Sequence, residues 1–98
     1  MVLVNILNGQ GTKGIAALAK GIIEVAFGSN KNILKIIETK NADNFNYKKT
    51  RIIIFTSKAG TDKVAEDLKK LIGVGEISKS ADSFDNVDIT VIIGSDYK

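Results

Sequence analysis

With 98 residues, 44% of them hydrophobic and 26% charged, the chain is long enough for one globular domain with a single two-layer core, and its composition excludes a disordered chain. Because cysteine and histidine are both absent, thiol nucleophiles, histidine bases, disulfides and ordinary zinc sites are excluded. The net charge of +3 is mild, but the charges are unevenly distributed. Residues 31–58 carry seven cations against two acids, whereas residues 59–98 carry eight acids against five lysines. This distribution indicates a polarised surface rather than a general polyanion binder.

The amino-terminal third predicts a strand followed by a helix. Residues 2–7 are largely apolar on both faces, with Asn5 as the polar exception, which predicts a central strand that ends at Asn8 and Gly9. Apolar residues then recur at helical spacing, with Thr12 placed as the N-cap and Gly28 as the C-terminal stop. The face expected to turn toward the sheet consists of Ile15, Leu18, Ala19, Ile22 and Ala26.

The remaining strands follow from β-branched, apolar runs between polar segments. Residues 33–39 predict a second strand and residues 51–55 a third, separated by a polar loop at residues 40–49. Residues 74–78 predict a short edge strand, and residues 87–93 predict a buried strand that closes the chain.

A second helix is predicted between the third strand and the short edge strand. Asp62 lies in its first turn, Lys69 and Lys70 lie in its last turn, and Gly73 takes the C′ position, as the helix dipole and cap rules favour. The residues on its apolar side are Val64, Ala65, Leu68, Leu71 and Ile72.

This element order, β-α-β-β-α-β with a short extra edge strand, predicts an α+β fold in a two-layer sandwich. Right-handed crossovers make the strands of each β-α-β pair parallel. The simplest arrangement is the split β-α-β, ferredoxin-like layout with both helices on one face of the sheet, although the edge strand can alter the strand order. Residues 1–98 are expected to form this single domain.

Gly9, Gly11 and Gly14 have the spacing of a dinucleotide-binding fingerprint between a strand and a helix. The acid that this fingerprint requires is not in place, because Glu38 comes 24 residues after Gly14, and the chain is too short for the larger sheet of such sites. The structural interpretation is that Gly9 adopts a turn conformation and Gly14 lets the helix lie close to the sheet. An alternative stays open, in which the amides of this corner and Lys13 bind an anion or a nucleotide.

The basic middle of the chain raises nucleic-acid binding as a third interpretation. Lys48, Lys49 and Arg51 beside Tyr47 can contact phosphates, but a solvated hairpin loop explains them as well. Asn5 stands where the first strand of an RNA-recognition motif would carry a base-stacking aromatic residue. No nucleic-acid partner is therefore expected.

Metal and catalytic sites find little support. Asp82, Asp85 and Asp88 recur every three residues, whereas a calcium loop prefers alternate positions around a glycine, so a solvated acidic loop explains them better. The hydroxyls of Ser57 and Ser80 have no predicted base beside them. We expect no metal, no cofactor and no catalytic residue in this chain.

Several stretches together resemble the LytR C-terminal domain family. They are VNILNGQGTKGIAALAK from Val4, KNADNFNYKKTRIIIF from Lys40, AEDLKKLIG from Ala65 and VDITVIIGSDY from Val87. Members of the family carry an Asn-Gly corner with a small-residue helix, a polar loop with an NAD…Y stretch, and a closing D-x-T-V-x-x-G-x-D-Y. The match covers nearly the whole chain in the right order. Under this resemblance the glycine corner is the first β-α turn of the family.

The resemblance implies an accessory domain of LytR-CpsA-Psr proteins, which are membrane-anchored cell-envelope proteins of bacteria. They attach glycopolymers to the wall through a separate catalytic domain, whose Arg/Asp constellation this chain does not carry. The resemblance therefore implies a non-catalytic, extracytoplasmic interaction domain within a longer, membrane-anchored protein. Its implied partner is wall glycopolymer, another envelope protein or a second copy of itself.

The candidate interaction surface combines the corner at residues 8–14 with the loop at residues 41–49. Its residues are Asn8, Lys13, Phe45, Tyr47, Lys48 and Lys49. Aromatic rings in a polar loop often stack on sugars or proteins. For Phe45 a second alternative stays open, because its ring can instead tuck into the core.

Overall fold

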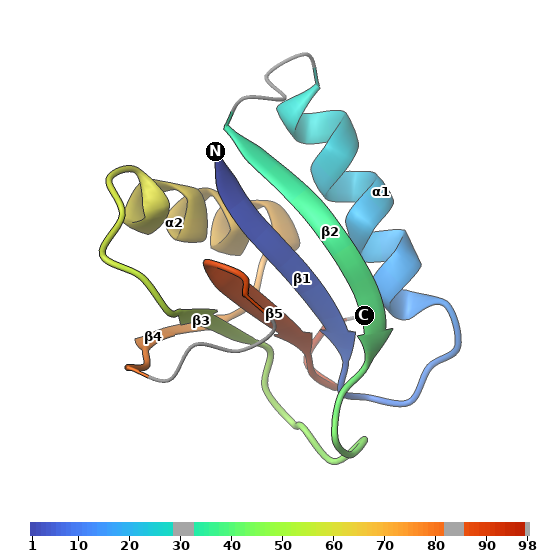
Figure 1. Ribbon diagram of the computed structural model, residues 1–98. Coiled ribbons are helices and arrows are strands. Elements are labelled where there is room, and N and C mark those ends of the chain that lie inside the picture. The colour runs from blue at the N-terminus through green and yellow to red at the C-terminus, as the bar shows by residue number, and fades with distance from the viewer. Residues whose placement is uncertain (29–32, 82–85, 98) are drawn as a thin grey trace.

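The computed structural model describes residues 1–28, 33–81 and 86–97. The elements follow the predicted order, including the short extra strand (Figure 1). Their bounds are β1 Val2–Asn8, α1 Ile15–Phe27, β2 Leu34–Asn41, β3 Arg51–Ile54, α2 Thr61–Ile72, β4 Glu76–Lys79 and β5 Ile89–Ile93.

Within the described part of the chain, the strands form a five-stranded mixed sheet in the order β2-β1-β5-β3-β4. β1 pairs in parallel with β2 and with β5, whereas β3 pairs antiparallel with β5 and parallel with β4. Residues of both helices share one hydrophobic core with alternate residues of the strands, such as Val4, Ile6, Ile89 and Val91. The predicted α+β two-layer class is therefore confirmed.

The strand order differs from the split β-α-β, ferredoxin-like layout. In that layout another strand separates the two strands of a β-α-β unit, whereas here β1 lies next to β2 and β3 lies next to β4. The short β4 accounts for the second of these pairs, because it gives β3 a parallel neighbour across α2. The two units run in opposite directions on either side of β5, so right-handed crossovers place α1 and α2 on the same face of the sheet.

The two helices differ in how well the sequence identified their buried faces. In α2 the residues buried against the sheet include Val64, Ala65, Leu68 and Ile72, and Gly73 is the C-cap, as predicted. In α1 the buried residues are Ile15, Ala16, Ala19 and Ile23. Leu18 and Ile22 were predicted to face the sheet, but they are 56% and 38% exposed. Because α1 is apolar on more than one side, periodicity alone did not select its buried face.

The predicted roles of Gly9 and Gly14 are reversed in the structure. Gly14, not Thr12, is the N-cap of α1, with a left-handed φ of 81°, and a Cβ added there would meet nothing within 4 Å. Gly9 has no positive φ, but a Cβ there would lie 2.8 Å from side-chain carbons of Ile92 and Tyr47. Gly9 is thus required by close approach, and Gly14 by its backbone conformation.

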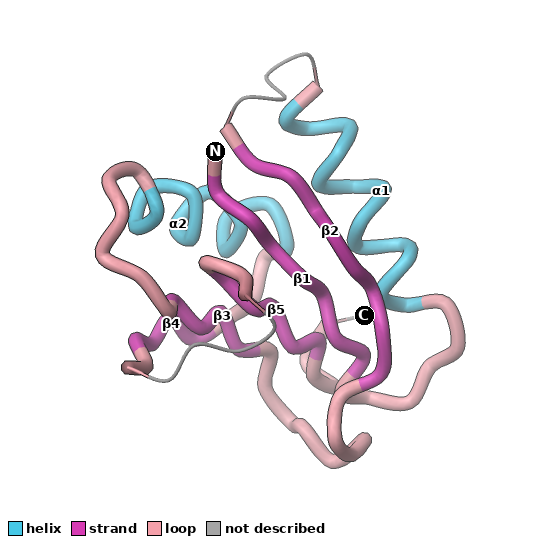
Figure 2. Tube along the Cα trace, in the orientation of Figure 1, coloured by secondary structure: helices cyan, strands magenta, loops and turns pink. Residues whose placement is uncertain are grey.

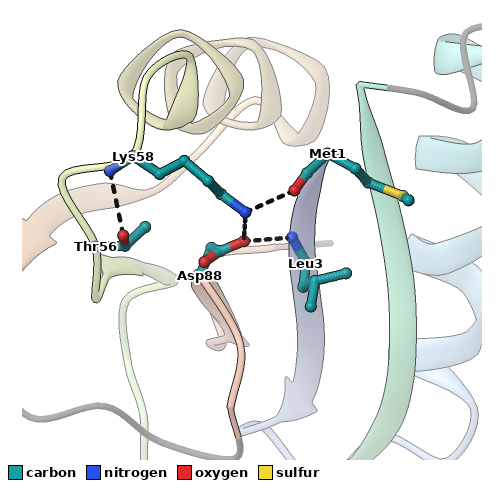
Figure 3. A network of polar contacts seen from close by, with 5 residues as sticks. All are labelled: Met1, Leu3, Thr56, Lys58 and Asp88. Atoms are coloured by element: carbon teal, nitrogen blue, oxygen red, sulfur yellow. Dashed lines mark hydrogen bonds and ion pairs between the residues drawn. The ribbon is translucent and has the colours of Figure 1, made fainter.

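A polar network joins the start of β1, the start of β5 and the segment before α2 (Figure 3). One carboxylate oxygen of Asp88 accepts a hydrogen bond from the Leu3 amide at 2.8 Å and pairs with Lys58 Nζ at 2.8 Å. Lys58 Nζ also donates to the Met1 carbonyl at 2.7 Å. Burial raises the pKa of Asp88, but the Leu3 amide and the Lys58 ammonium group outweigh it and hold this pKa below its ordinary value. Asp82 and Asp85 lie outside the described residues.

We expect acid to weaken the fold partly through Asp88. A carboxyl whose pKa is lower in the folded state contributes stability that is complete above its unfolded pKa, about 4, and is lost as the pH falls through the folded value. Asp88→Asn should therefore lower the Tm at neutral pH and flatten its decline in acid. Thermal unfolding between neutral and acidic pH checks this, with the exposed Asp62→Asn as the control. An acid decline in Asp88→Asn as steep as in the wild type would contradict it.

Candidate interaction surface

Three segments meet beyond the carboxyl ends of β1 and β5: the corner at residues 9–14, the loop at residues 42–50 and the carboxyl-terminal residues 94–97. We call this region the loop end, and Figure 2 shows its loops gathered at one end of the sheet. The Tyr47 amide donates to the Gly9 carbonyl at 3.1 Å, and the Ser95 amide donates to the Tyr47 carbonyl at 2.9 Å. Both parts of the predicted surface therefore lie side by side.

Asn8 organises the glycine corner from within. Its side-chain oxygen accepts the amides of Gln10 at 3.1 Å and Gly11 at 2.9 Å, and its side-chain nitrogen donates to the Thr12 carbonyl at 2.8 Å. The Gly9 amide donates to the carbonyl of the last β5 residue. Because these amides already have acceptors inside the protein, they do not form an open nest for a phosphate.

The carboxyl-terminal segment is tied to the same region. Gln10 Nε2 donates to the carbonyls of Gly94 at 2.8 Å and Tyr97 at 2.9 Å. The Asp96 carboxylate accepts hydrogen bonds from the amide and the hydroxyl of Thr50, at 2.8 and 2.7 Å. The Thr50 hydroxyl in turn accepts the Gly94 amide at 3.0 Å. The Asn-Gly corner and the closing Gly-x-Asp-Tyr thus hold the loop end together.

The aromatic rings of the loop lie outside the hydrophobic core, which decides the alternative left open for Phe45. Phe45 is 48% exposed, and its Cβ lies 3.3 Å from where a Cβ of Gly11 would be. Tyr47 is partly buried, and its hydroxyl donates to Asp43 at 2.7 Å. This hydrogen bond, with burial, raises the pKa of Tyr47. The Arg51 guanidinium carbon lies over the Tyr47 ring, 5.8 Å from its centre. At this distance the positive charge of the guanidinium group is attracted to the π electrons of the ring.

An open groove of about 470 Å³ lies beside Tyr47. The residues that give it its chemistry are Asn44, Asn46, Tyr47, Lys48, Arg51 and Glu76. Lys49 also lines it, and its Nζ lies 3.4 Å from Glu76, with both side chains exposed. Amides, a phenol ring and a planar guanidinium group are suited to hydroxyl-rich and anionic ligands.

The structure divides the predicted site residues into three groups. Tyr47, Lys48 and Lys49 line the groove. Lys13 and Phe45 are exposed at or beside the glycine corner and are not part of its lining. Asn8 is only 6% exposed, so its side chain serves the corner rather than a ligand.

Several groove residues were missed by the sequence interpretation. Asn44 and Asn46 belong to the Asn-rich loop and could have been included on composition. Arg51 was considered only for nucleic acid. Glu76 comes from β4, and it reaches the groove because β3 and β4 pair with Arg51 opposite Glu76. No local pattern around Glu76 indicates this position.

No helix among residues 1–28, 33–81 and 86–97 has the length and apolar character to cross a lipid bilayer. A family model described as LytR cell envelope-related transcriptional attenuator matches residues 1–97. The fold is similar to the solution structure of the C-terminal domain of RV0431, with a TM-score of 0.58 and 15% sequence identity, over 97% of this chain and 73% of that one. At this identity the likeness shows the fold alone. No curated protein matches the sequence.

Proposed function

We propose a function from the family to which the chain belongs, which is the LytR cell envelope-related transcriptional attenuator family, the LytR C-terminal domain. The chain is a non-catalytic, extracytoplasmic interaction domain, and it is part of a longer, membrane-anchored protein of the bacterial envelope. The accessory role and the association with the cell envelope follow from membership of the family. The finer proposal is that this domain binds an anionic wall glycopolymer at the loop end. The groove beside Tyr47 is the observation that carries it.

Charge in the groove supports an anionic ligand. Lys49 is paired with Glu76, but among the described residues Lys48 and Arg51 have no carboxylate partner. The Arg51 guanidinium fork can bind a phosphate or carboxylate with two parallel hydrogen bonds, and Lys48 adds a second cation nearby. These cations match the acidic groups of a charged polymer.

The other groove residues support a hydroxyl-rich ligand. The side-chain amides of Asn44 and Asn46 can donate to and accept from sugar hydroxyls. The Tyr47 ring supplies an apolar edge next to these polar groups. An open groove on the surface also suits a chain that passes across the domain better than it suits an enclosed small molecule.

The polar groups of the loop end support a binding role rather than catalysis. The Tyr47 hydroxyl is committed to Asp43, and its raised pKa keeps it protonated near neutral pH. The rival proposal of a nucleotide site in the glycine corner is less favoured, because the amides of Gly9, Gln10 and Gly11 already have acceptors inside the protein.

Lys48→Ala and Arg51→Ala should each weaken binding to purified anionic wall glycopolymer roughly tenfold, because each removes a charge-assisted hydrogen bond worth about 1.5 kcal/mol. Isothermal titration calorimetry measures the affinity, and thermal unfolding shows that each variant is folded. Lys70→Ala on the exposed side of α2 is the matched control for loss of one positive charge. If Lys70→Ala weakens binding as much as Lys48→Ala does, the loss of affinity reflects only the net charge of the domain, and the proposal is contradicted.

A further inference from the structure

Strand β4 forms one edge of the sheet, on the side of the molecule away from α1 (Figure 1). Within the described part of the chain, no strand lies beyond it. The amides of Glu76 and Ser80 donate toward β3, to backbone carbonyls that are both at 2.9 Å. Because backbone groups alternate along a strand, the N–H and C=O groups of Ile77 and Lys79 point away from β3. β4 therefore presents hydrogen-bonding groups at which a further strand can pair.

A groove of about 410 Å³ lies between β4 and helix α2. Ile77 is opposite Ile52 in the pairing of β3 with β4 and packs against the hydrophobic core, so its side chain lies on the helix face of the sheet. Lys79 follows two residues later on the same face, where its Nζ lies 3.5 Å from the Asp62 carboxylate of α2. A strand added to β4 would therefore direct every second side chain toward this groove. The residues that line it are Glu66, Lys69, Lys70, Gly73 and Ile77.

The charges around this groove favour an acidic partner. Lys69 and Lys70 are exposed, and among the described residues neither has a carboxylate partner. Glu66 also lines the groove, so the lining carries a net positive charge. Lys79 adds a cation at the end of β4, and its ion pair with α2 joins side chains that are 70% and 71% exposed, where such a pair contributes little. Glu76, on the other face of β4, disfavours acids on that face.

We propose that the edge of β4 binds an extended, acidic peptide segment of a partner protein by strand addition. The peptide backbone pairs with the outward groups of Ile77 and Lys79, and carboxylates at alternate positions lie beside Lys69 and Lys70. A four-residue edge with charged side chains resists unselective pairing, so the charge of the peptide decides which segment binds. This site uses the face of β4 opposite to the groove of the loop end, and it does not depend on the binding of glycopolymer there.

Titration of the ¹⁵N-labelled chain with a synthetic peptide of alternating glutamate and threonine tests this proposal. The alternation places all the carboxylates on one face of the extended peptide. We expect saturable shifts of the amides of Ile77 and Lys79, and hydrogen exchange at least about tenfold slower at both, because both amides gain an acceptor. The same peptide with lysine in place of glutamate should not bind. A glutamate peptide that fails to bind at millimolar concentration, or a lysine peptide that binds equally well, would overturn the proposal.

Lys79→Pro, with Lys79→Ala as its matched control, tests the pairing of the backbone. Both substitutions remove the ammonium group, but only proline removes the outward N–H, and it leaves the hydrogen bonds to β3 in place. Lys79→Pro should weaken binding of the glutamate peptide at least about tenfold relative to Lys79→Ala, because its ring also blocks the edge. Both variants should still bind the anionic wall glycopolymer. Equal affinity of the two variants for the peptide would overturn strand addition.

Lys70→Glu tests the charge of the groove without a change in β4. Lys70 is exposed on α2, so the variant should keep the wild-type Tm. It should weaken binding of the glutamate peptide at least about tenfold, because it places like charges beside one another. This variant also carries the test if thermal unfolding shows that Lys79→Pro does not fold. Affinity for the peptide equal to that of the wild type would overturn the proposal.

Discussion

Gly94→Ala should destabilise the fold by about 3 kcal/mol, the largest effect that we expect from a single methyl group. Gly94 is buried, and a Cβ there would lie 2.6 Å from the Lys49 carbonyl oxygen and 2.8 Å from the Thr50 amide nitrogen. These are backbone atoms, which cannot rotate away as a flexible side chain can. Moving them apart would strain the hydrogen bond from the Gly94 amide to the Thr50 hydroxyl.

Denaturant unfolding of Gly94→Ala and of Gly21→Ala measures this effect with a matched control. Gly21 receives the same methyl group in open space within a helix, so its substitution should raise the stability of the fold slightly. The two alanine variants should therefore change stability in opposite directions. If Gly94→Ala is as stable as the wild type, the close contact between the carboxyl-terminal segment and the loop does not exist in solution.

Asp96→Ala should destabilise the fold by about 2 kcal/mol, because it leaves a buried donor without an acceptor. Thr50 is fully buried, and both its amide and its hydroxyl donate to Asp96. Without the carboxylate, the Thr50 amide loses its partner away from water. The hydroxyl can still accept the Gly94 amide, so we expect the carboxyl-terminal segment to loosen rather than the whole sheet to fall apart.

Asp96→Asn separates the hydrogen bonds of Asp96 from its charge. The amide oxygen of asparagine can accept the Thr50 amide in the same place, so this variant should retain most of the stability that Asp96→Ala loses. Thermal unfolding gives the comparison, and hydrogen exchange of the Thr50 amide reports the local loss. Equal stability of the alanine variant and the wild type would show that this acceptor is dispensable.

The helices and strands could be predicted from the sequence because each is marked by local periodicity and by its ends. Asp62, Lys69, Lys70 and Gly73 placed α2 correctly, since they act on the helix that contains them. The strand order could not be read in the same way. It depends on whether β4 pairs with β3 across α2, and the four residues of β4 carry no sign of their partner.

The glycines show a second limit of the sequence. Gly9 and Gly14 look alike in a spacing pattern, but one is required by its neighbours and the other by its backbone angle. Only Ile92 and Tyr47, which are distant in the chain, reveal why Gly9 must be small. In α1, apolar residues on two faces concealed which one meets the sheet, so the exposed face of Leu18 and Val25 became visible only in the folded chain.

The residues of the candidate site that come from a single segment could be predicted from the sequence. The loop at residues 42–50 contributes Tyr47, Lys48 and Lys49, and all of them were named from its polar, aromatic composition. Glu76 enters from another strand through pairing, and Asn8 turns inward because the corner amides need its side chain. Contacts between distant segments thus decided which polar residues face a ligand and which stabilise the fold.

The most direct test of the loop end as a binding surface is a titration of the ¹⁵N-labelled chain with purified anionic wall glycopolymer, followed by amide chemical shifts. We predict saturable shifts at the residues that line the groove, which are Asn44, residues 46–49, Arg51 and Glu76. The amides on the exposed face of α1 should not respond to the polymer. Shifts confined to residues outside the groove, or none at polymer concentrations well above those of the wall, would contradict the account.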